Sequence, residues 1–250
     1  GTEKCWELCD HHHLPRILFV SQMDKEHANF EKVFQDVRDH LSPKVLPVEI
    51  PVGDGPAFKG IINLFTGTCQ MFRPGSKSGE YDEGPIPDEY RDVFGRYTEQ
   101  FAEAVAATDD GLIEKFLAGE PLSREEVAPA MKRAIQAGEI VPLFCGSGEH
   151  LFGVRTLLTE IVELLPSPVE VPRPAEAPLV ARVFKVISEP HVGDVSLFRL
   201  YCGSVRNGEE VWNAEHQVAE KLGHLSVQQG KERIEVPELA AGDIGSVAKL

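Results

Sequence analysis

Two short polar turns, each placed directly after an apolar run, hold the residues with the clearest chemical potential. "ILFV" (17–20) leads into "SQMD" (21–24), and "VPLFC" (141–145) leads into "GSG" (146–148). In an open α/β sheet, ligands bind outside the carboxyl ends of the strands. The first turn ends in a carboxylate, and the second offers a hydroxyl and backbone N–H donors. We therefore expect both turns to contribute to one binding site.

The candidate binding residues of these turns are Ser21, Gln22, Asp24, Ser147 and Gly148. Each has a plainer alternative. An aspartate at this point also begins helices and turns, and a serine after a strand is a common turn residue. It is the pairing of the two turns that favours a site.

The elements that must position these turns are buried strands with helices between them. Residues 16–20 and 140–145 are short and apolar, which predicts strands. "KVLPVEIPVG" (44–53) predicts a further strand, and a short helix is expected over 2–13. Two helical faces follow the turns, one for each: Phe30, Val33, Phe34, Val37 and Leu41, then Val154, Leu157, Leu158, Ile161, Leu164 and Leu165.

The stretch between the two turns is long enough for an inserted subdomain over residues 51–139. Residues 53–87 are rich in glycine and proline and predict loops with a small sheet, whereas 88–138 predict helices. Gly119 and Pro121 separate two helices, Ser123-Arg-Glu-Glu126 forms a capping box, and Gly138 is placed as a C-terminal cap.

The composition changes after residue 165. "PSPVEVPRPAEAP" (166–178) is proline-rich and predicts a stiff linker. Residues 179–250 contain six strand-like runs, and Asn207-Gly208 predicts a hairpin. We expect an α/β region made of residues 1–50 and 140–165, the insertion, and then a small β-barrel.

The bulk composition narrows the class of protein. The formal net charge is −15 and 42% of the residues are hydrophobic. A uniformly acidic chain binds free nucleic acid poorly but can dock through local patches. No run is long enough to span a membrane, and five scattered cysteines do not form a disulfide framework. These features favour the cytoplasm. The cluster Cys5, Cys9 and His11–His13 matches no common zinc spacing.

Several longer stretches carry a resemblance to a known family. "LPRILFVSQMD", "VLPVEIPVGDGPAFKGIINL", "FAEAVAATDDGLIEKFLAGE", "AGEIVPLFCGS", "VFKVISEPHVGDVSLFRLYCGSV" and "AGDIGSVAKL" resemble translation elongation factor G and its paralogues, which are translational GTPases. The resemblance implies the C-terminal part of a P-loop GTPase fold, interrupted by an insertion and followed by the second domain of the family. The 123 positions between Asp24 and Ser147 fit that insertion.

The resemblance also implies roles for the two turns. The first is similar to the Asn-Lys-x-Asp loop, in which the carboxylate accepts two N–H bonds from guanine; this role falls to Asp24. The second is similar to the Ser-Ala-x loop, whose backbone N–H reaches the guanine O6. Three positions depart from the family pattern: Ser21 replaces asparagine, Gln22 replaces lysine, and Gly148 replaces alanine. Each departure is expected to weaken binding by roughly 1 kcal/mol.

The phosphate-binding parts of such a site are not found in the sequence. There is no G-x-x-x-x-G-K-[ST] motif and no Asp-x-x-Gly near the start. We therefore expect a fragment whose parent binds GTP or GDP with Mg²⁺, and we expect no bound cofactor and no catalysis from this chain alone.

The partners implied by the resemblance are ribosomal. The acidic helical stretch 88–126 would contact the ribosomal stalk protein, and the β-barrel would contact small-subunit ribosomal RNA through Arg182, Lys185, Arg199 and Arg206. Two alternatives remain open: a non-catalytic ribosome-associated paralogue that has lost nucleotide binding, and a ribosomal protection protein.

Overall fold

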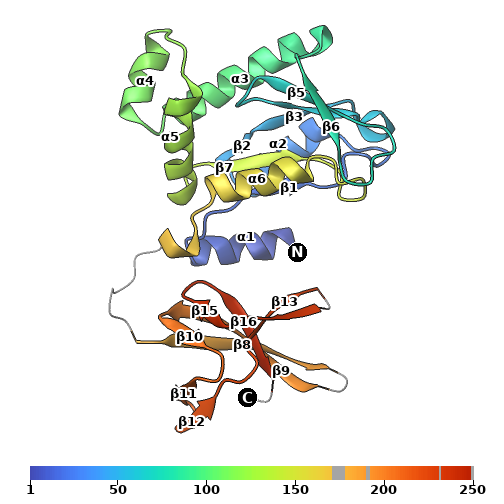
Figure 1. Cartoon of the computed structure of the whole chain (residues 1–250). Coiled ribbons are helices and arrows are strands. Elements are labelled where there is room, and N and C mark those ends of the chain that lie inside the picture. The colour runs from blue at the N-terminus through green and yellow to red at the C-terminus, as the bar shows by residue number, and fades with distance from the viewer. Residues whose placement is uncertain (171–177, 190–191, 231, 249–250) are drawn as a thin grey trace. The chain divides into compact units, whose positions relative to one another are not determined.

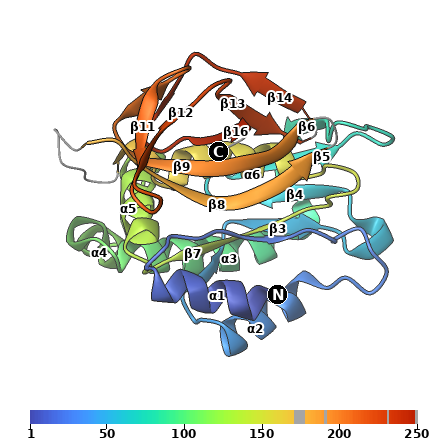
Figure 2. The same cartoon turned by 90° about the horizontal axis from the view of Figure 1, so that it is seen from below.

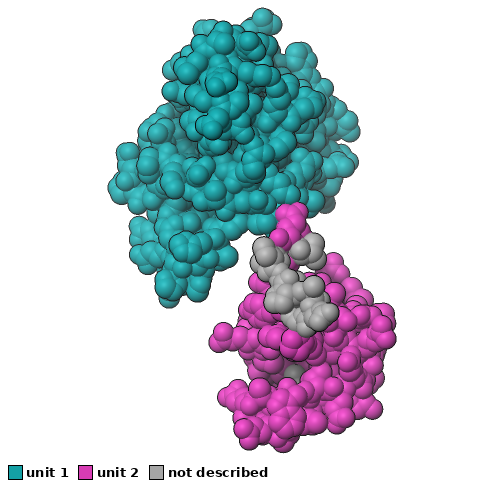
Figure 3. All heavy atoms as spheres, turned by 90° about the vertical axis from the view of Figure 1, so that its left-hand side faces the viewer, with its two compact units in different colours: residues 1–166 teal, residues 167–250 magenta. Residues whose placement is uncertain are grey.

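The computed structural model divides into two compact units, residues 1–166 and 167–250 (Figures 1 and 3). It describes every residue except 171–177, 190–191, 231 and 249–250. Most of the linker predicted over 166–178 therefore lies outside the described residues. Unit 1 is α/β with a mixed insertion and unit 2 is all-β, as predicted for the fold class.

Unit 1 contains a three-stranded parallel sheet. Its order is β1 (Leu18–Val20), β7 (Val141–Cys145) and β2 (Val45–Pro47). Three helices belong to this part of the chain: α1 (Thr2–His11), α2 (Phe30–His40) and α6 (Val154–Leu164). The central strand β7 is buried at all five positions, which explains its uninterrupted apolar sequence.

The helix predicted from Phe30 forms as expected. Asn29 caps α2, because its side-chain oxygen accepts the backbone N–H of Lys32 at 2.8 Å. Phe30 and Phe34 are buried on the predicted face and their rings stack.

The single strand predicted over 44–53 is wrong. It forms two strands, β2 in the parallel sheet and β3 (Glu49–Val52) in an antiparallel sheet. Between them Val48 still donates its backbone N–H to Leu143 of β7 at 3.0 Å. The mainly apolar run, with Glu49 as the charged residue between Val45 and Val52, gives no sign of such a change of partner, because both strands are largely buried.

The region 51–139, predicted to be an inserted subdomain and called the insertion below, contributes to a sheet and forms three α-helices. The sheet order is β3, β4 (Gly60–Asn63), β5 (Thr68–Phe72) and β6 (Tyr81–Gly84). Figures 1 and 2 place β4–β6 at one end of unit 1 and the helices α4 (Asp110–Leu117) and α5 (Arg124–Gln136) at the other. The helix α3 (Arg91–Ala106) completes the subdomain.

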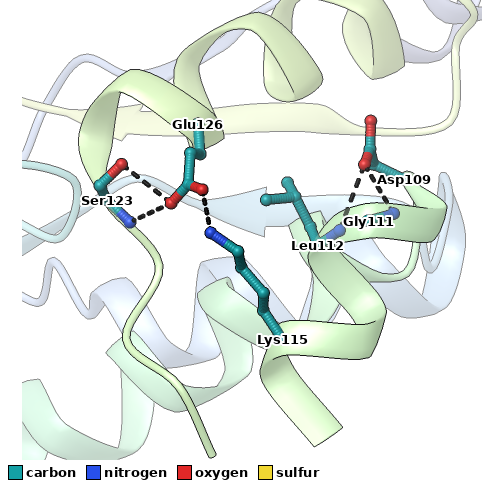
Figure 4. Close-up of polar contacts among 6 residues, drawn as sticks. All are labelled: Asp109, Gly111, Leu112, Lys115, Ser123 and Glu126. Carbon is teal, nitrogen blue, oxygen red and sulfur yellow. Dashed lines mark hydrogen bonds and ion pairs between the residues drawn. The ribbon is translucent and has the colours of Figure 1, made fainter. Parts of the chain in front are cut away.

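Gly119 and Pro121 separate α4 from α5, as predicted, and the helical stretch before them is further divided at Asp109 into α3 and α4. The Asp109 carboxylate caps α4 by accepting the backbone N–H groups of Gly111 and Leu112 at 3.1 and 3.2 Å (Figure 4). A side-chain cap of this kind begins a new helix without any proline or glycine signal.

The capping box predicted at the start of α5 is confirmed. The Glu126 carboxylate accepts from the backbone N–H and the hydroxyl of Ser123 and also pairs with Lys115 of α4 (Figure 4). These contacts, first the one from Lys115, lower the pKa of Glu126 to about 2. Gly138 follows α5 with φ +69°, the left-handed conformation of a C-terminal cap.

The apolar face predicted for α6 is only partly buried. Leu164 is buried, whereas Leu158, Ile161 and Val162 are exposed. The other buried residues of α6 are polar, namely Thr156 and Glu160.

Unit 2 contains nine strands within its described residues instead of the six predicted. A five-stranded sheet has the order β14 (Glu232–Glu235), β13 (Ser226–Gln229), β16 (Ile244–Ala248), β9 (Gly193–Cys202) and β8 (Val180–Glu189). Two pairs accompany it: β10 (Ser204–Arg206) with β15 (Glu238–Ala240), and β11 (Glu210–Asn213) with β12 (Val218–Lys221). Phe198, Leu200, Leu225, Leu239 and Val247 belong to one core.

The hairpin predicted at Asn207-Gly208 is not formed. Gly208 does adopt a turn conformation with φ +81°. However, β10 pairs with β15 and β11 pairs with β12, so the two strands that flank the turn do not pair with each other. The turn at Gly208 therefore forms locally, whereas the pairing of the strands depends on how they pack in unit 2.

Candidate functional site

The parallel sheet brings the two polar turns together. β1 and β7 run parallel, with Val20 opposite Cys145, so both turns begin at the same sheet edge. The Gly146 N–H donates to the Val20 carbonyl at 2.9 Å, and the Met23 N–H donates to the Gly146 carbonyl at 3.0 Å. All five candidate residues predicted from the sequence therefore lie in adjoining turns.

Two buried side chains anchor the turns. Met23 is 1% exposed and packs into the hydrophobic core of unit 1, and Ser147 is fully buried. The Ser147 hydroxyl accepts the N–H of His150 at 3.2 Å. Gly146 leaves no space for a side chain, since a Cβ there would lie 2.2 Å from the Phe152 carbonyl oxygen. Ser21 and Gln22, in contrast, are exposed.

Asp24 provides a charged and mostly buried carboxylate. Its side chain is 11% exposed, and its Oδ1 atom is buried without a hydrogen-bond partner. Burial alone would raise the pKa of Asp24, but hydrogen bonds from the Ser147 and Lys25 side chains outweigh it and lower the pKa. The group is thus ionised at neutral pH, and one of its oxygen atoms remains available to a donor.

Three residues that the sequence reasoning missed surround this carboxylate. Lys25 Nζ lies 3.0 Å from Asp24 Oδ2 and also pairs with Glu149 of the second turn. Its contact with Glu149, then that with Asp24, raises the pKa of Lys25. His150 Nε2 lies 3.9 Å from the same Asp24 oxygen. The sequence could have pointed to these three residues, because Lys25 directly follows Asp24, and Glu149 and His150 directly follow Gly148.

The backbone donors of the second turn are already engaged. The Gly148 N–H donates to the Ser21 carbonyl at 2.8 Å, and the Ser147 N–H donates to the Phe152 carbonyl at 2.9 Å. The donor that the family resemblance assigns to guanine O6 is therefore held within the protein.

The inserted subdomain reaches the second turn through the loop between β5 and β6. Phe72, at the end of β5, stacks on Phe152 with ring centroids 4.2 Å apart. Gly79 has φ +67°, and a Cβ there would lie 2.1 Å from the Leu151 carbonyl oxygen. Only glycine permits this close approach, so the loop and the turn are fitted to each other.

A cavity of about 440 Å³ lies between the insertion and the two polar turns. Asp24, His150 and Phe152 line it from the turns. Gly55, Pro56, Phe58 and residues 74–77 line it from the insertion. The cavity combines apolar walls with groups of both charges, as ligand sites commonly do.

Neither a metal cluster nor a membrane span was found in the described part of the chain. No three histidine, cysteine or acidic side chains there are arranged to hold a metal ion. Cys5, Cys9 and His11 belong to α1, and His12 and His13 follow it. No described helix is long and apolar enough to cross a membrane.

Of the four basic residues predicted to contact RNA, two are direct neighbours in the second unit and the other two lie apart from them. Arg182 of β8 stands directly opposite Arg199 of β9. Arg199 lies over the Tyr201 ring, and its Nε is buried without a partner. Lys185 is exposed farther along β8, whereas Arg206 pairs with Glu238 in another sheet.

Comparison with known proteins finds relatives for both units. The family model of the elongation factor Tu GTP binding domain matches residues 1–167, and that of elongation factor G domain 2 matches residues 178–250. A crystal structure of a protein from Thermus thermophilus is similar with a TM-score of 0.86 and 34% sequence identity. The match covers 100% of this chain and 36% of that protein, so the chain spans about a third of its relative's length.

Proposed function

Because the chain belongs to the translational GTPases of the elongation factor G type, we propose that it supplies the guanine-reading part of a GTPase acting on the ribosome. The parent protein would bind GTP or GDP with Mg²⁺ and hydrolyse GTP. The parts that hold the phosphates and the metal would lie outside residues 1–250, so this chain alone would not catalyse hydrolysis.

The observation that carries the proposal is the unpartnered, buried Oδ1 of Asp24 at the joined turns. A buried acceptor without a donor is costly, and a ligand N–H removes the cost. Guanine offers two such donors side by side, N1–H and the exocyclic N2–H, and a carboxylate accepts both. The lowered pKa of Asp24 supports the ionised form that this pairing needs.

The same turns also predict weak binding. Ser21 is too short for the bridging bonds of asparagine, and Gln22 lacks the charge of lysine. The Gly148 N–H must leave the Ser21 carbonyl before it can reach the guanine O6. Lys25 and His150 stand beside the Asp24 carboxylate and must shift if both of its oxygens are to face the base.

Exchanging the base that is recognised tests the proposal directly. Asp24→Asn replaces one acceptor by an amide donor, which suits xanthine, whose O2 accepts where guanine N2–H donates. We expect the full-length protein to bind GDP, and the Asp24→Asn variant to lose GDP but gain xanthosine diphosphate. Binding of both nucleotides unchanged in the variant, or no GDP binding by the unaltered protein at high micromolar nucleotide, would overturn the proposal.

The insertion is proposed to contact the ribosomal stalk protein. Its helices expose many acidic residues, namely Asp88, Glu89, Asp92, Glu99, Glu103, Asp110, Glu114, Glu120 and Glu125. Leu117 of α4 is 78% exposed among them. An apolar side chain within an acidic surface suits a partner that is basic around an apolar centre. Leu117→Ser should weaken binding to purified stalk protein, whereas Gln100→Ser on α3 should not.

The second unit is proposed to contact small-subunit ribosomal RNA. Arg182 and Arg199 are two like charges placed opposite each other, which is unfavourable until an anion lies between them. A phosphate group of RNA meets that need. Replacing both by glutamine should weaken ribosome binding and reduce its dependence on salt, while Arg206→Gln, which breaks an existing ion pair, should do so less.

A second candidate function is a ribosome-associated paralogue without nucleotide binding, acting like the first in the cytoplasm. The closed Gly148–Ser21 hydrogen bond and the two substitutions at Ser21 and Gln22 favour it. Ribosome binding that persists in the full-length protein without any GDP binding would select this alternative. A ribosomal protection protein remains a third, related possibility, which rescue of translation from a ribosome-targeting antibiotic would identify.

A further inference from the structure

The two turns proposed to read the base have no unpaired lysine at position 22, where the family pattern has one. Gln22 occupies that position and is exposed. The neighbouring cation, Lys25, is already held by Asp24 and Glu149. A lysine at such a place covers one face of a purine with its stem and contributes a positive charge. A lysine from another segment that reaches the same site could supply both contributions.

The insertion places a lysine in the same cavity as Asp24. Lys77 lies in the loop between β5 and β6 and lines the cavity of about 440 Å³ opposite the turns. It is exposed, and no carboxylate in the described part of the chain lies within ion-pair distance of it. Its ammonium group is therefore free to contact a ligand.

The loop that carries Lys77 is held in place by several contacts. The Ser76 hydroxyl accepts the backbone N–H of Glu80 at 2.9 Å, and the Arg73 N–H donates to the Glu80 carbonyl at 2.8 Å. At its two ends, Phe72 stacks on Phe152 and Gly79 fits against Leu151. The loop thus presents Lys77 from a defined position beside the second turn.

The cavity walls suit a flat aromatic ligand. Phe58 and Phe152 both line it, and Phe72 packs against each of their rings, at 5.5 and 4.2 Å between centroids. Aromatic rings stack on any nucleobase, whatever its hydrogen-bonding groups. The Asp24 carboxylate would then distinguish guanine from the other bases. The cavity therefore has a reading group, apolar walls and one free cation.

We propose that Lys77 of the inserted subdomain takes over the role of the lysine missing at position 22 and contacts the nucleoside of a bound guanine nucleotide. The proposal rests on the proposed function, since it assumes that Asp24 reads guanine. It assigns the insertion a part in nucleotide binding as well as in docking.

The test compares binding of GDP and guanosine to the full-length protein and to variants, by equilibrium dialysis with labelled ligand. Lys77→Met keeps the stem length and removes the charge, and should weaken binding of both ligands by roughly three- to tenfold, the effect of one charge-assisted contact at a partly exposed site. Lys77→Arg should restore most of the affinity. Lys32→Met on α2 is the matched control and should change nothing.

The outcomes separate the two proposals. If the unaltered protein binds neither ligand, the proposed function fails and this inference falls with it. If it binds both and Lys77→Met binds them equally well, only the inference is overturned. If Lys77→Met loses affinity for GDP but not for guanosine, Lys77 contacts phosphate, and the assignment to the nucleoside is wrong.

Discussion

The backbone N–H of Gly148 donates to the carbonyl oxygen of Ser21 at 2.8 Å, which joins the two polar turns directly. In the proposed function, this N–H group is the donor that would reach the guanine O6. Lys25 joins the same turns a second time, through Asp24 and Glu149. The two turns are thus held together by contacts between them.

Restoring the family pattern at the first turn should strengthen nucleotide binding. The double variant Ser21→Asn, Gln22→Lys regains two polar contacts of roughly 1 kcal/mol each, so GDP affinity should rise by tenfold or more on that basis. Titration of the full-length protein with a fluorescent GDP analogue measures it. Gln100→Lys on α3 adds the same charge elsewhere and serves as the control. An unchanged affinity in the double variant would show that this turn does not contact the base.

Releasing Lys25 should raise the pKa of Asp24. Burial favours the neutral acid, and the hydrogen bonds from Ser147 and Lys25 are what lower the pKa. Lys25→Met removes one of these bonds and a nearby positive charge. Carbon-13 NMR titration of the Asp24 carboxyl group should therefore show an upward shift, with Lys32→Met unchanged. A pKa that stays in place would mean that Lys25 does not hold the carboxylate in solution.

Glu49 should make unit 1 less stable as the pH rises. It is fully buried, and burial raises its pKa to about 8. A long backbone contact from Cys145, outside ordinary hydrogen-bond geometry, opposes this shift, and the charge of Glu160 adds to it. The folded protein therefore binds a proton that the unfolded chain has already released. This contribution to stability is complete below the unfolded pKa of about 4.3 and is lost as the pH rises to about 8.

Glu49→Gln should remove that dependence and stabilise unit 1 by a few kcal/mol at pH 8, on the order expected for a shift of several pKa units. Urea unfolding at pH 5 to 9 measures it. In a Trp212→Phe background, Trp6 of α1 is the sole remaining tryptophan and reports on unit 1. Glu89→Gln, on the surface, is the control. A Glu49→Gln variant with the same slope against pH as the unaltered chain would contradict the assignment.

Gly79 should be far less tolerant of alanine than Gly75. Both have positive φ, +67° and +77°, so each alanine incurs about 1–2 kcal/mol of backbone strain. A Cβ at Gly79 also meets the Leu151 carbonyl at 2.1 Å, whereas one at Gly75 meets nothing within 4 Å. Urea midpoints should fall clearly further for Gly79→Ala. Equal losses in the two variants would show that the loop does not pack on the second turn.

Much of the fold could be predicted from the sequence, because the residues that specify these elements lie close together in the chain. The helix from Phe30, the capping box at Ser123 and the cap at Gly138 depend on residues within one or two turns of each other. The approach of Asp24 and Ser147 was also predictable, because each follows an apolar strand, and the carboxyl ends of neighbouring parallel strands share one sheet edge.

Other features were decided only by tertiary structure, because they depend on which segments meet. The run 44–53 divides between two sheets, and the strands flanking Asn207-Gly208 pair elsewhere, since partner choice follows from burial across the whole unit. The Gly148–Ser21 hydrogen bond and the place of Lys77 beside Asp24 join segments far apart in the chain. The sequence by itself determined that two polar turns follow neighbouring parallel strands, because apolar runs and turn residues are local signals. Packing determined that the two turns bond to each other and that the insertion lines the same cavity as Asp24, because these contacts join segments distant in the chain.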